Sequence, residues 1–237
     1  INFYKMNGTL LIALILNLNL YTAASIQGAW QLKGSGDPGE VASLIITADY
    51  MSVAVYNEST HEFLRTYGGT YTLTDQKLKW SLEYDSKDTM MIGKIVDFSY
   101  QLSSNALTLE RESKVTWTRI DDHQSDLAGC WRITARVGND GTLNAMPQGA
   151  RKTLKIMSGT RFQWFAINPS TRQFSGTGGG TYTLADGKYT ETIEFFSRDK
   201  SRVGSSLSFD AKVDGGTWDH SGKSSTGNPV HEIWTRQ

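Results

Sequence analysis

Apolar and polar residues alternate in short segments along most of the chain, and turn residues separate the segments. In residues 78–85 (LKWSLEYD), for example, every second residue is apolar until the final acid. A period of two places one face of a β-strand against a core and the other against water. No long helical periodicity follows residue 25. The pattern therefore predicts an all-β protein.

One long motif occurs twice. Residues 59–73 (STHEFLRTYGGTYTL) return as residues 170–184 (STRQFSGTGGGTYTL), at an offset of 181 − 70 = 111. The triplets 28–30 (GAW) and 129–131 (GCW) recur before the two copies, and 117–119 and 234–236 (both WTR) recur after them. Each unit is large enough to bury its own core. We predict a unit at 26–120, a polar linker at 121–126 and a second unit at 127–237.

Each unit divides into eight short strands. In the first unit we expect strands near 28–34, 41–48, 50–56, 62–74, 77–85, 93–102, 106–111 and 114–120. In the second they fall near 129–136, 152–158, 161–167, 173–185, 188–197, 203–213, 217–221 and 230–236. Asp186-Gly187 and Asp214-Gly215 are strong hairpin turns. Eight strands of this length allow a sandwich or a barrel.

The ends of each unit favour the barrel. A Gly-x-Trp on the first strand and a Trp-x-Arg on the last let the guanidinium lie over the indole when first and last strands pair. With these residues the chain resembles the calycin superfamily, lipocalin-like domains in particular: Gly28, Trp30 and Arg119, then Gly129, Trp131 and Arg236. Residues 180–204 are also similar to uncharacterised secreted lipocalin-like domains of Bacteroidota. The resemblance implies two tandem eight-stranded up-and-down antiparallel barrels. Lipocalins usually have one barrel, often with a disulfide bond. The tandem arrangement and the single cysteine of this chain depart from that pattern.

The first 25 residues differ from the rest. An apolar run at residues 10–20 precedes small residues at 23–25, which is typical of an export signal cleaved near Ala24. The run is shorter than the roughly 20 residues of a membrane-spanning helix. We therefore expect a secreted or periplasmic protein with a signal peptide at 1–25 and no membrane span after cleavage. The alternative is an uncleaved N-terminal anchor.

The composition limits the chemistry. The 24 Lys and Arg residues balance 24 Asp and Glu residues, which argues against nucleic acid as a partner. Cys130 is the only cysteine and is expected to be a small buried hydrophobe. The four histidines lack metal-ligand spacing, and we find no nucleophile–base–acid set. We predict no catalytic residue, no metal and no cofactor, and hence no enzyme. Glu83 and Glu194 recur on the outward face, which favours a structural hydrogen bond or a contact between units.

The fifth strand of each unit shows how the interiors differ. Its inward set in the first unit is Leu78, Trp80, Leu82 and Tyr84, and the offset of 111 gives Tyr189, Glu191, Ile193 and Phe195 in the second. Glu191 thus replaces Trp80. A carboxylate in an apolar lining needs a cation, a hydrogen-bond donor, water or a raised pKa. We expect it to be the polar anchor of an open cavity. The alternative is a filled core with a water-bonded Glu191.

The second unit also has longer loops at 137–151 and 221–229, which in an up-and-down barrel lie at the same rim. The alternative is neutral variation of surface loops. His220, beside Trp218, is expected near this enlarged mouth. The predicted ligand-binding residues are Phe162, Trp164, Tyr182, Glu191, Phe195, Phe209, Trp218 and His220.

These features predict an exported binding protein that holds a small apolar or amphipathic molecule in the second barrel. The first barrel would be packed more tightly and serve as a scaffold or as a module that docks a partner. The alternative function is a cell-envelope interaction module, with closed barrels that bind protein or glycan and no small ligand.

Overall fold

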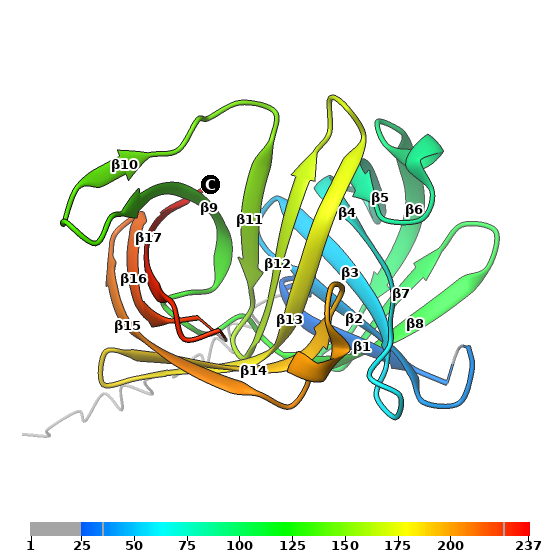
Figure 1. The fold of residues 1–237 in the computed structure, drawn as a ribbon. Coiled ribbons are helices and arrows are strands. Elements are labelled where there is room, and N and C mark those ends of the chain that lie inside the picture. The colour runs from blue at the N-terminus through cyan, green and yellow to red at the C-terminus, as the bar shows by residue number, and fades with distance from the viewer. Residues whose placement is uncertain (1–24, 35, 225) are drawn as a thin grey trace, which may run out of the picture.

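The computed structural model describes residues 25–34, 36–224 and 226–237, and it consists of two closed β-barrels side by side (Figure 1). Every strand pairs antiparallel with its neighbour, and β1 pairs with β8 to close the first barrel. The strands of the first barrel are β1 (Gly28–Lys33), β2 (Glu40–Ile46), β3 (Tyr50–Asn57), β4 (Phe63–Thr74), β5 (Lys77–Asp85), β6 (Ile95–Leu102), β7 (Ala106–Glu110) and β8 (Lys114–Asp121).

The second barrel closes through pairing of β9 with β17. Its strands are β9 (Gly129–Val137), β11 (Lys152–Met157), β12 (Arg161–Asn168), β13 (Gln173–Ala185), β14 (Lys188–Phe196), β15 (Ser206–Asp214), β16 (Thr217–Lys223) and β17 (Pro229–Arg236). The prediction of two eight-stranded antiparallel barrels is confirmed. The alternation did not reveal the short strand β10 (Leu143–Ala145), which pairs with β9, or the 3₁₀ turns η1 (Thr89–Met91) and η2 (Lys200–Arg202).

The predicted signal peptide lies almost wholly in residues 1–24, which are outside the described residues. Among the residues that the structure describes, no helix is long and apolar enough to cross a membrane. Asp121, assigned by sequence to the linker, is the last residue of β8.

The two ends of each barrel are joined as expected. The Arg119 guanidinium carbon lies 4.0 Å from the centre of the Trp30 ring, and that of Arg236 lies 4.2 Å from the Trp131 ring. Both indoles are fully buried. The Trp30 indole N–H donates to the Ile26 carbonyl oxygen (3.0 Å), and Trp131 repeats the contact with Leu127 (2.7 Å). The two barrels are therefore closed in the same way.

The repeated 15-residue motif builds the frame of each barrel. The Thr66 hydroxyl donates to the Val53 carbonyl oxygen, and its counterpart Thr177 donates to Trp164. Tyr71 and Tyr182 likewise donate to the carbonyl oxygens of Thr47 and Ser158. The glycines at 69 and 180 have no room for a Cβ atom, which would collide with the carbonyl oxygen of the facing strand. The motif is accordingly structural, and the chemistry must be sought elsewhere.

The barrels pack together through the outer faces of β2–β5 and β11–β14, where Figure 1 shows them meeting. Residues separated by 111 positions touch each other there: the Ser52 hydroxyl donates to Gln163 (2.6 Å), and Phe63 stacks on Phe174. The barrels are thus related by an approximate twofold axis. Cys130 lies in the same apolar interface, where burial raises the pKa of its thiol to about 12. The thiol is a buried hydrophobe, as predicted.

The two recurring glutamates hold this interface. Glu83 of the first barrel accepts hydrogen bonds from Tyr50 (2.8 Å) and from Lys152 of the second barrel (2.8 Å). Glu194 of the second barrel accepts one from Tyr56 of the first (2.8 Å) and pairs with Arg161. The interpretation of the pair as a contact between units is confirmed.

Candidate functional site

The second barrel encloses a cavity of about 520 Å³. Its rim carries arginines that are exposed or half-buried, and they come from β9, from the loop before β11 and from the β14–β15 connection. Buried side chains and the half-buried Glu232 form its base. The rim arginines are Arg136, Arg151, Arg198 and Arg202; the walls include Trp164, Ile193, Phe196 and Leu207; the base includes Lys155, Glu191, Phe209, His220, Glu232 and Trp234.

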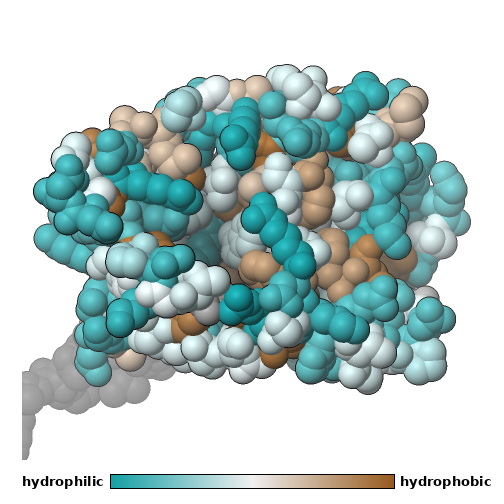
Figure 2. Space-filling model, in the orientation of Figure 1, coloured by the Kyte–Doolittle hydropathy of each residue, from teal (hydrophilic) through white to brown (hydrophobic). Residues whose placement is uncertain are grey.

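Both enlarged loops reach this cavity. Arg136 and Arg151 flank the β9–β11 connection, and Ser224 and Val230 flank the β16–β17 connection; all four line the cavity. The face in Figure 2 is mostly hydrophilic, and apolar residues show on it as separate patches. The two insertions therefore border one opening.

A buried ion pair lies at the base. The Lys155 ammonium nitrogen is 2.9 Å from Glu191 Oε2, and the Tyr189 hydroxyl donates to the same oxygen at 2.8 Å. Lys155 also lies 4.5 Å from the centre of the Tyr189 ring. Glu191 thus has the cation and the hydrogen-bond donor that a buried carboxylate requires. Because these partners come from the barrel itself, Glu191 is engaged without a ligand.

A second polar pair lies beside the first. Glu232 Oε2 is 3.7 Å from His220 Nδ1, and Glu232 also pairs with Arg136 at 3.2 Å. Burial lowers the pKa of His220 and outweighs the opposing effect of Glu232, so the imidazole is neutral at pH 7. Burial raises the pKa of Glu232, but the His220 contact and Arg136 outweigh it and lower that pKa, so Glu232 is a carboxylate.

Three buried nitrogens that border the cavity lack a partner. His220 and Trp234 are each 4% exposed, and neither imidazole nitrogen of His220 nor the indole nitrogen of Trp234 has a hydrogen-bond partner among the described residues. Both side chains line the cavity. An unsatisfied buried polar group costs about 1–3 kcal/mol. These atoms are the strongest sign of a bound group in the barrel.

The predicted site residues divide into three groups. Trp164, Glu191, Phe209 and His220 line the cavity. Phe162, Tyr182 and Trp218 are buried in the packed core beneath it. Phe195 lies outside the barrel.

The placement of Phe195 was wrong because β14 contains a β-bulge. Gly179 pairs with Phe195 and Gly180 with Ile193, so Glu194 is an extra residue and the alternation shifts by one. Phe195 stacks on Tyr56 of the first barrel, with ring centres 4.9 Å apart, and the next residue, Phe196, lines the cavity instead. The same bulge in β5 turns Tyr84 outward onto Phe165.

The expectation that His220 lies at the mouth was also wrong. β16 continues to Lys223, two residues beyond its predicted end, so His220 lies three residues before the end of the strand instead of one, and its side chain is buried. Its ring contacts Phe209 (4.2 Å between centres) and Trp218 (5.1 Å).

Sequence reasoning missed Lys155 and Glu232, although the comparison that singled out Glu191 could have found them. The offset of 111 maps Lys155 onto Leu44, and the offset of 234 − 117 = 117 in the last strand maps Glu232 onto Val115. Both are exchanges of an apolar residue for a charged one.

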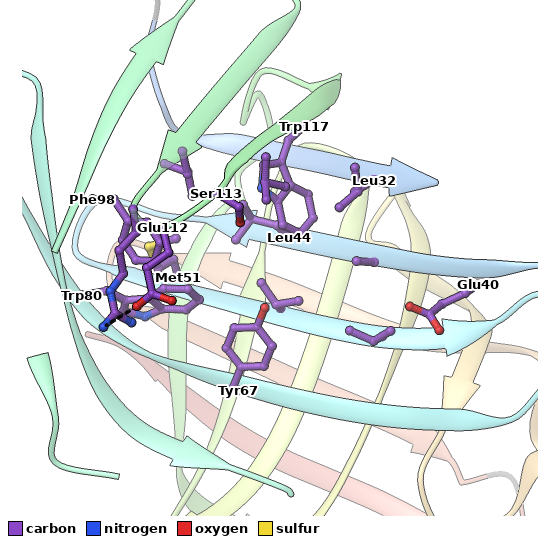
Figure 3. Close-up of a pocket in the computed structure, with 16 residues that line it drawn as sticks. Leu32, Glu40, Leu44, Met51, Tyr67, Trp80, Phe98, Glu112, Ser113 and Trp117 are labelled. Carbon is purple, nitrogen blue, oxygen red and sulfur yellow. Dashed lines mark ion pairs between the residues drawn. The ribbon is translucent and has the colours of Figure 1, made fainter. Parts of the chain in front are cut away.

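The first barrel also contains a cavity, of about 400 Å³ (Figure 3). It is smaller than the second, as expected for the barrel with the tighter packing, but the first barrel is not filled. Tyr67, Trp80 and Trp117 surround it together with aliphatic side chains. Its charged lining residues are Glu40, Arg111 and Glu112, and the last two form an exposed pair at 3.4 Å. The two cavities therefore differ in polarity more than in size.

Within the described residues there is no group of three or more His, Cys, Asp or Glu side chains that could hold a metal ion.

Comparisons with known proteins found a family model and solved structures that match part of the chain. The model of a family described as a domain of unknown function (DUF4488) matches residues 126–237, which is the second barrel. A solved lipocalin-like protein from Bacteroides uniformis is similar at 14% identity with a TM-score of 0.34, over 48% of this chain and all of that one. No curated protein matches the chain.

Proposed function

We propose that this chain is a binding protein, without catalytic activity, for a small amphipathic molecule that carries a negative charge. The second barrel holds the ligand. The observation that supports this most is the lining of its cavity, in which five cationic side chains outnumber two carboxylates around an aromatic interior. Its volume falls within the usual range for ligand pockets, about 300–1,000 Å³.

The two ends of the ligand meet different surfaces. The negative group lies at the rim, where Arg151 has no ion pair among the described residues and where clustered positive charge raises the local concentration of anions. The apolar body lies deeper, against Trp164, Phe196 and Phe209. Arg198, which lies 6.0 Å from the centre of the Trp164 ring, connects the two regions.

The interaction-module alternative requires interiors that are filled. Cavities of about 400 and 520 Å³ in the two barrels favour a small ligand over that alternative.

Export is part of the proposal. The apolar run at residues 10–20, followed by small residues, supports removal of the first 25 or so residues and a secreted or periplasmic location. N-terminal sequencing of protein from its own host tests this: a start near residue 25 supports cleavage, and an intact leader contradicts it.

Isothermal titration of the full chain with dodecanoate and dodecyltrimethylammonium, each below its micellar concentration, tests the function. These amphiphiles share a chain length and differ in sign of charge. We expect dodecanoate to bind once per chain, at least tenfold more tightly than the cation. Equal binding of the two, or no binding of either, contradicts the proposal.

A charge reversal locates the site. Arg151→Glu should weaken dodecanoate binding about three- to tenfold because it removes rim charge, and the effect should shrink at high salt. Arg111→Glu, at the mouth of the first barrel, is the matched control and should change little. If Arg111→Glu has the larger effect, the ligand lies in the first barrel.

A further inference from the structure

The deepest part of the second cavity is polar but nearly neutral. Lys155 is paired with Glu191, and Glu232 faces both Arg136 and His220. A ligand carboxylate placed there would meet two carboxylates whose cations are already engaged, and a ligand ammonium would meet Lys155. Either charge would also lose its hydration. A neutral polar group is the kind that this base accommodates.

The protonation state of His220 determines which hydrogen bonds the neutral ligand group must make. Glu232 Oε2 lies 3.7 Å from Nδ1 and favours the tautomer with its proton on Nδ1, since a carboxylate can only accept. Nε2 is then an acceptor. The indole nitrogen of Trp234 is a donor only. Neither atom has a partner among the described residues, so the base offers one acceptor and one donor.

We infer that the ligand of the second barrel carries a hydroxyl group at its deep end, which donates to His220 Nε2 and accepts from the Trp234 indole N–H. The inference rests on the proposed function, since it concerns the same cavity. His220 pairs with Glu232 and Trp218 pairs with Trp234, so His220 and Trp234 are diagonal neighbours on β16 and β17. A hydroxyl between the two rings both donates and accepts, and so can serve both nitrogens. The ligand is then a hydroxylated anionic amphiphile, with its negative end at the arginine rim and its hydroxyl at the base.

The nitrogens lie just beneath the cavity surface, since both side chains line the cavity while the atoms themselves are covered. The entering hydroxyl must therefore be accompanied by a small rotation of each ring. The sister barrel lacks this arrangement, because Leu109 and Val115 stand at the positions of His220 and Glu232. The polar base belongs to the second barrel.

A matched pair of ligands tests the inference in the full chain. Dodecanoate and 12-hydroxydodecanoate differ only in a terminal hydroxyl, and isothermal titration gives the affinity of each. Two recovered hydrogen bonds should make 12-hydroxydodecanoate bind about tenfold more tightly. If dodecanoate binds and the hydroxyl adds nothing, the inference is wrong and the proposed function stands. If neither binds, the proposed function itself fails.

Two variants assign the preference to the named nitrogens. His220→Leu, which introduces the residue of the sister barrel, and Trp234→Phe should each reduce the ratio of the two affinities to about threefold or less, whatever the change in the affinity for dodecanoate itself. Trp117→Phe, the equivalent change in the first barrel, is the control and should leave the preference intact. A preference that survives both variants contradicts the inference.

A structural readout covers the case in which a variant unfolds. With 12-hydroxydodecanoate labelled with ¹³C at C12, the intact protein should give nuclear Overhauser contacts from that methylene to the His220 ring. Contacts to residues of the rim instead overturn the inference.

Discussion

The two barrels share a frame and differ in their interiors. Closure by an arginine over a tryptophan, the buried threonine and tyrosine contacts and the interface glutamates occur in both. Four cavity positions have changed from apolar to titratable: Leu44 to Lys155, Trp80 to Glu191, Leu109 to His220 and Val115 to Glu232. The frame is set by residues at the barrel ends and on the outer faces, which leaves the interior free to take on different chemistry.

Exchanging the apolar pair Leu44 and Trp80 for the ion pair Lys155 and Glu191 is expected to change the stability of the barrel little. A buried ion pair and its hydrophobic replacement are often close in free energy, because desolvation offsets the Coulombic attraction. The stability of the barrel therefore does not explain why Lys155 and Glu191 stand where the first barrel has Leu44 and Trp80.

If the frame is common to both barrels, the same truncation should harm each of them. Trp30→Ala and Trp131→Ala each remove a fully buried indole and should lower the free energy of unfolding by about 3–5 kcal/mol. Urea denaturation measures both. Arg236→Ala should cost less, because part of the guanidinium is exposed. A loss within about 0.5 kcal/mol for either tryptophan would contradict its place in the closure.

The Lys155–Glu191 ion pair offers a way to test whether the interior of the second barrel can be exchanged while the frame stays intact. Glu191→Leu leaves Lys155 buried without its carboxylate and should cost about 3 kcal/mol. The double change Lys155→Leu with Glu191→Trp restores the pair found in the first barrel and should recover most of that loss. Thermal or urea unfolding of the parent chain, of Glu191→Leu and of the double variant measures these differences in stability. A double variant no more stable than Glu191→Leu would show that the interiors are not interchangeable.

One contact joins the two frames. Asp121, at the end of β8, accepts hydrogen bonds from the Ser158 hydroxyl (2.7 Å) and the Gly159 amide (3.1 Å) of the second barrel and from the Ala29 amide of the first (3.1 Å). Burial alone would raise the pKa of Asp121, but the hydrogen bonds from Thr160 and Ser158 above all outweigh it and lower that pKa.

A depressed carboxyl pKa adds stability above the unfolded value of about 3.9, and that stability is lost as the pH falls through the lower folded value. Asp121→Asn should therefore cost about 2 kcal/mol at neutral pH and progressively less in acid. Urea unfolding from pH 7 to pH 2 checks this; parallel curves for the variant and the parent chain would show that Asp121 is not the group responsible.

The sequence predicted the frame well because a closed barrel depends on alternation, turns and the pairing of its ends, all of which are local patterns. It failed at Phe195 because a bulge adds one residue without changing composition, although the run Gly178–Gly180 opposite was a sign of close backbone approach.

The interface was also not predicted in detail. In β11 and β12 the residues of both faces are largely apolar, with Leu154 and Phe165 facing the other barrel and Met157 and Phe162 facing the interior. Strands buried on both faces lose the alternation that distinguishes inside from outside. The charged base could have been predicted from the internal repeat, but the pairing of Lys155 with Glu191 required the register of the sheet.

The central claim is that the second cavity binds the ligand, with the negative group at its arginine rim. The most direct test is to reverse two rim charges together, Arg151→Glu and Arg198→Glu, and to titrate the full chain with dodecanoate. We expect a folded protein, with cooperative unfolding, that has lost its single site per chain. Unchanged affinity in a folded variant would contradict the claim.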